Sequence, residues 1–210
     1  GKTTFFNCIT SLQAPDKGSI IYSQQGKETE ITFKPAHKIA RMGLVRTFQN
    51  IRVFGNMTVL ENVLAGKYCR TSSGLLSALL MNGKAKAEEK KAEAECEELL
   101  ELTGLSEYGG LEAACLAHGL QRRLEIARAL AAGPSLLLLD EPAGGMNPAE
   151  TADLMELIKK IRKSGVTVFL IEHDMKVVMG ISDRVTVLNY VKKIAEGTPG
   201  EMQKNREVIA

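Results

Sequence analysis

The sequence has few cysteines, and none of them has the spacing of metal ligands. Cys8, Cys69, Cys96 and Cys115 are scattered along the 210 residues without a C-x-x-C pair. This spacing excludes the usual zinc sites. There is also no secretory leader, so we expect a cytoplasmic protein whose cysteines are free thiols, mostly acting as small buried hydrophobic residues.

A long apolar run is missing as well. The longest candidate, 75–81, is far shorter than the roughly 20 residues that a helix needs to cross a bilayer. If the protein serves a membrane process, we expect it to act through a partner that spans the membrane.

Neither sign of charge is in large excess. Lys and Arg number 27, Asp and Glu number 25, and the formal net charge is +2. A surface that binds nucleic acid usually shows a clustered basic excess, and this near balance does not indicate one. We expect no nucleic-acid partner.

The chain does not begin with methionine. It opens on Gly1-Lys2-Thr3-Thr4, which looks like the end of a longer motif, and we expect the front of the domain to lie upstream. The length suits one substantial domain or a core with a smaller lobe. Apolar residues make up 44% of the chain, which is enough for a packed core.

Three continuous apolar runs indicate the class of fold. The runs 136–139, 166–171 and 185–188 predict parallel strands that are buried on both faces. Between the first two, Asn147 can cap a helix that has Pro148 in its first turn. The inward positions of this helix are Leu154, Leu157, Ile158 and Ile161. Strand, helix and strand in this order form a right-handed crossover, so the second half is α/β.

The middle and the front of the chain have other patterns. The segment 84–102 is rich in Ala, Glu, Lys and Leu and predicts a long helix, whose charged run 84–91 lies on a solvated face. Together with 74–81, it predicts a helical lobe inserted into the α/β core. Near the front, 20–22 and 31–33 predict short antiparallel strands.

The opening motif points to phosphate binding. Gly1-Lys2-Thr3-Thr4 matches the last positions of the loop G-x-x-x-x-G-K-[ST], whose backbone amides and following helix hold phosphates. Lys2 would contact the β- and γ-phosphates, and the Thr3 hydroxyl would bind Mg²⁺. By itself so short a motif could equally be an ordinary helix start.

A second motif supplies acids at a strand end. The run 136–139 leads into Asp140-Glu141-Pro142, which places two carboxylates at the carboxyl edge of the predicted sheet, where ligands bind in open α/β folds. Asp140 would hold Mg²⁺, and Glu141 would orient and deprotonate the attacking water. The alternative is that two acids simply end a strand in solvent. The opening motif in the same chain favours the functional interpretation.

These two motifs together resemble the ATP-binding-cassette (ABC) family. Further motifs of that family follow in its order. They are Phe48-Gln49 at the Q-loop, 116–123 (LAHGLQRR) at the signature, Gly145-Met146-Asn147-Pro148 at the D-loop and Glu172-His173-Asp174 at the switch histidine. The similarity spans essentially the whole chain.

The resemblance implies a role for each motif. Gln49 would contact Mg²⁺ or the attacking water, and His173 would hydrogen-bond the γ-phosphate. In isolation, a loop Gln is usually only solvated and a His after a strand is usually structural. Ala117 and Gly119 of the signature would face the nucleotide of a second subunit, at the start of a helix expected over 121–131. Asn147 of the D-loop would also take part in nucleotide binding.

The signature departs from the family's usual LSGGQ sequence. Ala117 replaces Ser, and Leu120 replaces a polar residue. His118 replaces the Tyr of LAYG or LPYG, the sequence that one importer subgroup of the family often carries at this place. The backbone donors survive these changes, so we expect the contact with nucleotide to be weakened rather than lost.

Several stretches resemble one subgroup, the ATPases of branched-chain amino acid importers. These stretches are 46–54, 57–63, 171–175, 179–184 and 195–199, and an insertion at 67–91 fits the same subgroup. The apolar run 75–81 within the insertion is expected to pack in the core of the lobe; the alternative is a contact with membrane subunits.

The resemblance implies an α/β fold with a RecA-like P-loop NTPase core, an inserted helical signature subdomain and a small antiparallel β part, truncated at its N-terminus. The expected divisions are 1–49 for the first part of the core, 50–119 for the helical subdomain and 120–210 for the second part of the core. The implied activity is hydrolysis of ATP with Mg²⁺.

The resemblance also implies partners. They are a second ABC ATPase subunit, identical or paralogous, transmembrane permease subunits and, indirectly, a periplasmic solute-binding protein. The protein would lie peripherally on the cytoplasmic face of the inner membrane.

Three alternatives remain open at this point. They are a lipopolysaccharide-export ATPase, a non-transport ABC protein and an inactive fragment. If the chain is a fragment, we expect it to bind ATP poorly while its full-length form hydrolyses ATP. Equal, tight affinity of both forms in calorimetry would contradict this expectation.

Overall fold

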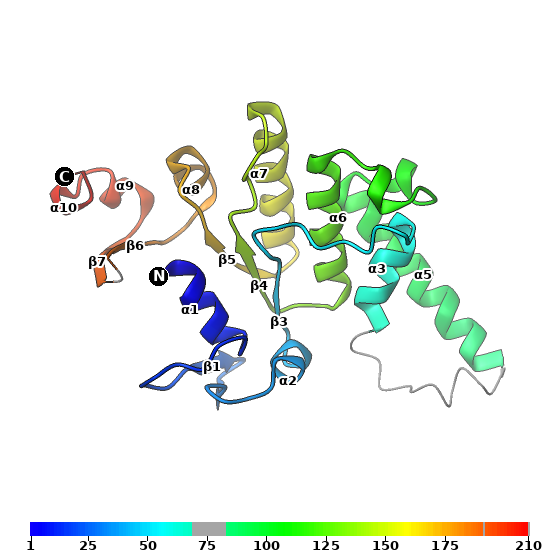
Figure 1. Cartoon of the computed structure of the whole chain (residues 1–210), viewed down its shortest axis with the longest axis horizontal. Coiled ribbons are helices and arrows are strands. Elements are labelled where there is room, and N and C mark those ends of the chain that lie inside the picture. The colour runs from blue at the N-terminus through cyan, green and yellow to red at the C-terminus, as the bar shows by residue number, and fades with distance from the viewer. Residues whose placement is uncertain (69–82, 191, 210) are drawn as a thin grey trace.

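The computed structural model describes residues 1–68, 83–190 and 192–209 (Figure 1). The expected packing of 75–81 and the state of Cys69 lie outside these residues. The elements are α1 (Lys2–Ile9), β1 (Ile21–Gln24), β2 (Lys27–Glu30), α2 (Ala36–Arg41), β3 (Leu44–Arg46), α3 (Val59–Tyr68), α5 (Gly83–Thr103), η1 (Ser106–Tyr108), η2 (Ala113–Cys115), α6 (His118–Ala131), β4 (Leu136–Asp140), α7 (Pro148–Lys163), β5 (Thr167–Ile171), α8 (Met175–Ile181), β6 (Val185–Asn189), β7 (Lys192–Gly197), α9 (Pro199–Met202) and α10 (Arg206–Ile209).

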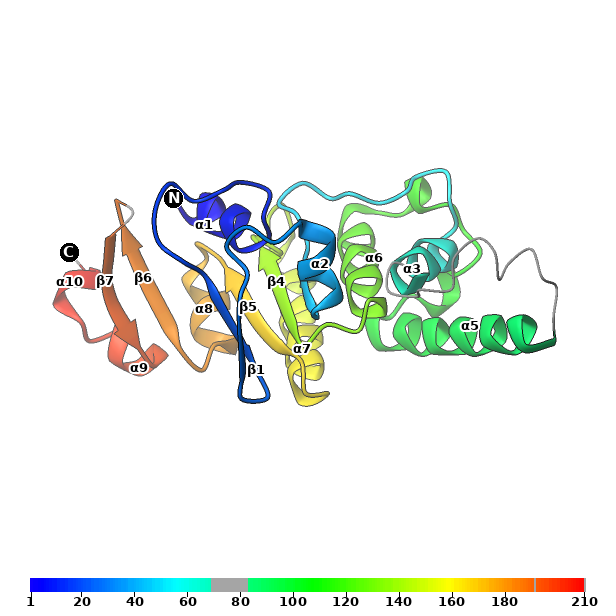
Figure 2. The same cartoon turned by 90° about the horizontal axis from the view of Figure 1, so that it is seen from below.

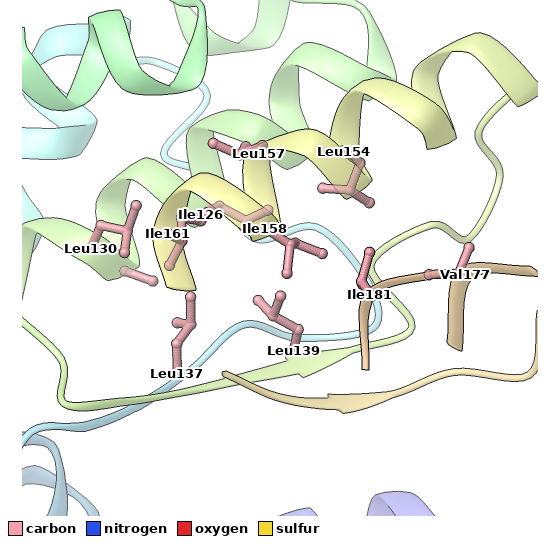
Figure 3. Close-up of a cluster of buried hydrophobic side chains, with 11 residues drawn as sticks. Ile126, Leu130, Leu137, Leu139, Leu154, Leu157, Ile158, Ile161, Val177 and Ile181 are labelled. Atoms are coloured by element: carbon pink, nitrogen blue, oxygen red, sulfur yellow. The ribbon is translucent and has the colours of Figure 1, made fainter. Parts of the chain in front are cut away.

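A three-stranded parallel sheet in the order β3-β4-β5 forms the centre of the fold. Its middle strand is covered on both faces. Leu137 and Leu139 point toward α6, α7 and α8 (Figure 3), whereas Leu138 packs with residues of α1 and α2. The two strands predicted at 136–139 and 166–171 are therefore confirmed as parallel neighbours, and the α/β class is confirmed with them.

The helix between these strands begins where the sequence predicted. The Asn147 side chain accepts hydrogen bonds from the Ala149 and Glu150 amides, and the Glu150 carboxylate accepts one from the Asn147 amide. This capping box satisfies backbone donors that the first turn leaves without helical partners. The predicted inward face is buried, namely Leu154, Leu157, Ile158 and Ile161.

A helical lobe made of α3, α5 and α6 stands beside the sheet (Figure 1). The long helix predicted at 84–102 is confirmed as α5. Helix α6 is shared, because Leu124 and Ala127 pack into the lobe while Ile126 and Leu130 pack against the sheet. The predicted division between 119 and 120 lies in the first turn of this helix.

Three expectations about strands are wrong. The run 166–171 is not buried on both faces, because alternate residues of β5 are exposed. The run 185–188 does form a strand, β6, but it pairs antiparallel with β7 in a separate hairpin, and alternate residues of β6 are exposed. At the front, the partner of β1 is β2 rather than 31–33. The chain turns at once, at Gln25 and Gly26, both with positive φ, so the hairpin closes early. Ile31 is then free to enter the core.

The lobe and the β6–β7 hairpin lie at opposite ends of the molecule, with the parallel sheet between them (Figure 2). Helices α9 and α10 pack beside β7. No helix in the described ranges is both long enough and apolar enough to cross a membrane.

The crossing of α3 and α6 provides a test of the lobe's packing. A Cβ atom at the buried Gly66 would clash with the Arg128 backbone, so we expect Gly66→Ala to lower the free energy of unfolding by about 1–3 kcal/mol, as overpacking does. Urea denaturation measures this change. The control is Gly110→Ala in the same lobe, where nothing lies within 4 Å of the added methyl group. Equal stability of the two variants would contradict the close helix crossing.

Candidate active site

The carboxyl edge of the parallel sheet gathers the acids that the sequence singled out. Asp140 is the last residue of β4 and lies opposite Ile171, the last residue of β5. The Glu141 amide then donates to the Ile171 carbonyl oxygen at 2.9 Å, which extends the pairing by one residue. Because the strands run parallel and end together, the chain following each of them starts from the same edge.

Glu141 has a backbone conformation that is unusual for its type. Its φ is +46°, in the left-handed region that L-residues other than glycine seldom adopt. Such strain persists where the surroundings hold it in place and is concentrated at functional sites. Two backbone hydrogen bonds keep Glu141 in this conformation. Its amide donates to the Ile171 carbonyl oxygen, and its carbonyl oxygen accepts from the Gly144 amide.

Gln49, Glu141 and His173 lie side by side. Gln49 Nε2 donates to Glu141 Oε2 at 3.0 Å, and His173 Nδ1 lies 3.7 Å from Glu141 Oε1. The side chain of His173 is 69% exposed, so its ring is open to a ligand. The structure thus brings together the three residues that the sequence proposed as catalytic, although they come from three separate loops.

Glu172 connects the loops that carry Glu141 and His173. Its side chain is almost fully buried, and Oε1 accepts from the Ala143 amide while Oε2 accepts from the His173 amide, each at 3.0 Å. It therefore fixes the loop after β4 to the loop after β5. Glu172 belongs to the switch-histidine motif, from which no role was predicted for it.

Asp140 is buried and paired with an arginine for which no role was predicted. Arg46 Nη2 donates to Asp140 Oδ2 at 2.7 Å, and the two side chains are 5% and 1% exposed. The other arm of the guanidinium, Nη1, donates to Asn7 Oδ1 in α1 at 2.7 Å. The rings of Phe6 and Phe48 each lie 5.4 Å from the guanidinium carbon. Arg46 thus joins α1 and β3 to the end of β4.

A physical rule could have suggested Arg46. A carboxylate at the end of a fully buried strand needs a cation nearby, because burying a lone charge is very costly. Arg46 ends the neighbouring strand β3 and lies two residues before Phe48 of the Q-loop motif. The pairing of β3 with β4 was not predicted, and for that reason the partner was missed.

One oxygen of Asp140 has no protein partner. Oδ1 is buried and forms no hydrogen bond within the described part of the chain, whereas Oδ2 is held by Arg46. A buried carboxylate oxygen of this kind suits a metal ion or a metal-bound water. The described residues contain no group of three or more His, Cys, Asp or Glu side chains that could enclose a metal.

The motif that was predicted to bind phosphate forms the start of α1. Gly1 is the N-cap, Lys2, Thr3 and Thr4 occupy the first turn, and all four are exposed. The helix is anchored at its other end by the buried Phe6 and Ile9. Among the described residues, no hydrogen bond or ion pair links Lys2 or Thr3 to Asp140 or Glu141. The first turn holds no acidic residue and no side-chain cap, so its amides remain available to an anion.

The signature helix begins earlier than predicted. We expected it over 121–131, but α6 starts at His118 with Ala117 as the extended N-cap, and the first helical bond runs from the Gln121 amide to the Ala117 carbonyl oxygen. The prediction was wrong because the departures from the family pattern leave no side-chain cap to mark the start. Ala117 and Gly119 thus lie at the helix N-terminus.

The signature also touches the D-loop of the same chain. A Cβ atom at Gly145 would lie 3.3 Å from the His118 ring, and one at Gly119 would meet the Glu150 carboxylate. Asn147, which we expected to bind nucleotide, uses its side-chain oxygen to cap α7. These residues form a second group, built from the ends of α6 and α7.

Comparisons with known proteins agree with this geometry. The ABC transporter family model matches residues 1–144. Over 210 residues the chain is 46% identical to the high-affinity branched-chain amino acid transport ATP-binding protein LivG of Salmonella typhimurium. The matched region covers 100% of this chain and 81% of LivG. It is 45% identical to BraF of Pseudomonas aeruginosa, another high-affinity branched-chain amino acid transport ATP-binding protein, with the same coverage.

Solved structures give the same picture. An ATP-binding cassette of an ABC transporter in its ADP conformation matches with a TM-score of 0.82 at 30% identity, over 100% of this chain and 82% of that one. A dimeric ATP-binding cassette in a post-hydrolysis state, bound to ADP and Pi, matches with a TM-score of 0.71 at 25% identity, over 95% of this chain and 81% of that one.

The buried pair of Arg46 and Asp140 generates a prediction. Arg46→Met leaves the Asp140 charge buried without its cation, and we expect this to lower the free energy of unfolding by about 3–5 kcal/mol. Adding Asp140→Asn removes the charge and should recover most of the loss. Guanidinium denaturation of the two variants measures the difference. If both were equally destabilised, loss of packing rather than charge would be the cause.

Proposed function

This chain belongs to the ATP-binding proteins of the ABC transporter family, and from that premise we propose that it is the ATP-hydrolysing subunit of an importer for branched-chain amino acids. The observation that supports the solute class is the match to LivG and BraF, at 46% and 45% identity across the entire chain. The observation that supports hydrolysis is the contact of Glu141 with Gln49 and its closeness to His173 at the sheet edge.

In the proposed mechanism, Glu141 accepts the proton of a water that attacks the γ-phosphate. The Gln49 amide orients Glu141 through their hydrogen bond, and the exposed His173 ring donates to a phosphate oxygen. The left-handed backbone of Glu141 supports this role, because strained conformations of this kind are concentrated at functional sites. These groups position and neutralise charge, which is the main task in phosphoryl transfer.

Phosphate binding is assigned to the start of α1. The amides of the first turn, with Gly1, Lys2, Thr3 and Thr4, would hold the phosphates, and the exposed Lys2 ammonium would offset their charge. Mg²⁺ would be held by Thr3, Gln49 and Asp140, a role supported for Asp140 by its unpartnered oxygen. When bound, Mg²⁺ neutralises charge on the β- and γ-phosphates.

A second ATPase subunit is part of the proposal. The N-terminus of α6 carries no acidic residue in its first turn, and Ala117 provides no side-chain cap. Its amides are therefore available to the nucleotide of a partner subunit, with Gly119 and Asn147 nearby. A related cassette is dimeric in its post-hydrolysis state.

The remaining partners follow from the proposed importer. We assign transmembrane permease subunits as direct partners, a periplasmic solute-binding protein as an indirect one, and the cytoplasmic face of the inner membrane as the location. Uptake of labelled leucine by cells that express the subunit with its neighbouring permease genes tests this assignment. Uptake that does not depend on the subunit would contradict it.

The proposed role of Glu141 predicts a specific kinetic change. In the full-length protein, Glu141→Gln keeps the shape of the side chain but removes the base, so we expect the rate of phosphate release to fall roughly 10²–10⁴-fold. ATP affinity, measured by calorimetry, should change little. The matched control is Glu156→Gln on the exposed face of α7, which should retain full turnover. Undiminished turnover in Glu141→Gln would rule out Glu141 as the base.

A further inference from the structure

Two buried side chains of α6 hold the backbone that carries Gln49. Arg122 and Glu125 are each 2% exposed and form an ion pair, with Arg122 Nη1 at 2.7 Å from Glu125 Oε2. They lie three residues apart on the helix, one turn beyond its start at His118. Neither residue was singled out for a role by the motifs.

The pair hydrogen-bonds the loop after β3 through backbone atoms. Arg122 donates from Nη1 to the Phe48 carbonyl oxygen and from Nη2 to the Gln49 carbonyl oxygen, both at 2.7 Å. Glu125 Oε1 accepts from the amides of Phe48 and Arg52, both at 3.3 Å. The planar guanidinium fork donates to the two carbonyl groups from two separate nitrogens in a fixed geometry, whereas a lysine has a single nitrogen on a flexible stem.

This loop has no regular secondary structure of its own. Residues 47–58 connect β3 to α3 without belonging to a helix or a strand. Their backbone groups therefore need other partners, and at 48–52 the Arg122–Glu125 pair supplies four of the bonds. The position of the Gln49 backbone is consequently set by α6.

The side chain of Gln49 nevertheless reaches the sheet. Its Nε2 donates to Glu141, which follows β4. Gln49 thus connects the signature helix α6 with the sheet. Its backbone is bonded to α6, and its side-chain amide is bonded to Glu141 after β4. A displacement of α6 relative to β4 would change the contact between Gln49 and Glu141.

We propose that Arg122 and Glu125 are positioning residues that transmit the placement of the signature helix to Gln49, and through it to Glu141. The inference rests on the proposed function, because it gives the hydrolytic site a mechanical link to the α6 N-terminus. Stability alone does not account for the pair, since a buried ion pair is often no better than apolar residues of similar volume. Its hydrogen bonds go specifically to the segment that carries Gln49.

The first test needs no ATPase activity. Amide hydrogen exchange and the side-chain NH₂ resonances of Gln49 are measured in the wild type, in Glu125→Gln and in Arg122→Lys. A double variant, Arg122→Met with Glu125→Met, is measured as well. It removes both charges, so it leaves no unpaired buried charge and can be used if a single change prevents folding. We expect exchange at Phe48 and Arg52 to rise at least about tenfold in the double variant, because their acceptor is gone.

The same spectra report on the link to Glu141. In the wild type, Glu141→Ala should shift the Gln49 NH₂ resonances. In the double-methionine background, the same change should leave them nearly unmoved, because Gln49 no longer reaches Glu141. A shift of equal size in both backgrounds would overturn the proposal. The control is Lys159→Met with Glu156→Met, an exposed pair at the same spacing on α7 with a 2.8 Å contact, which should alter neither measurement.

The second test uses turnover of the full-length protein. In the otherwise wild-type protein, Gln49→Ala should slow phosphate release by roughly tenfold or more. In the double-methionine background the same change should slow it by less than about threefold, because the effects of residues that act as a unit are not additive. Equal losses in both backgrounds would show that the pair is merely structural. If neither the wild type nor any variant hydrolysed ATP, the proposed function would be wrong. The exchange and resonance measurements would still decide whether α6 positions Gln49.

Discussion

The burial of β4 on both faces is the constraint on which this structure depends. Its three consecutive residues Leu137, Leu138 and Leu139 are all fully buried. Helices α6, α7 and α8 cover one face of the strand, and α1 and α2 cover the other. A strand enclosed in this way cannot end in an unpaired charge, yet its last residue is Asp140. Arg46 pairs with this charge and also joins α1 and β3 to the carboxyl edge of the sheet.

Helix α6 is the second organising element, because it belongs to two packed bodies at once. One of its faces fills the helical lobe and another covers the sheet. Its first turn lies against the D-loop, and its second turn holds the loop of Gln49. An element shared in this way is well suited to carry movement from the proposed partner subunit to the proposed hydrolytic residues, as shifts of packed helices do in other switching proteins.

Short-range signals made much of the fold predictable. The capping residues Asn147 and Glu150 lie within one turn of the helix that they start, and the apolar spacing of Leu154 to Ile161 depends only on helical periodicity. The candidate site was also partly predictable, since Gln49, Glu141 and His173 were proposed from motifs and lie together. The run 185–188 was misjudged because strand character is local but the choice of neighbour is not.

The sequence by itself determined the α/β class, the order of the motifs and the family, because these depend on residues a few positions apart. Only the tertiary structure decided which side chains meet across long separations. Arg46 and Asp140 are 94 residues apart, and Arg122 lies 73 residues from Gln49. Such pairs come together through the pairing of β3 with β4 and the packing of α6 beside the sheet, and no local pattern of residue types encodes a contact of that range.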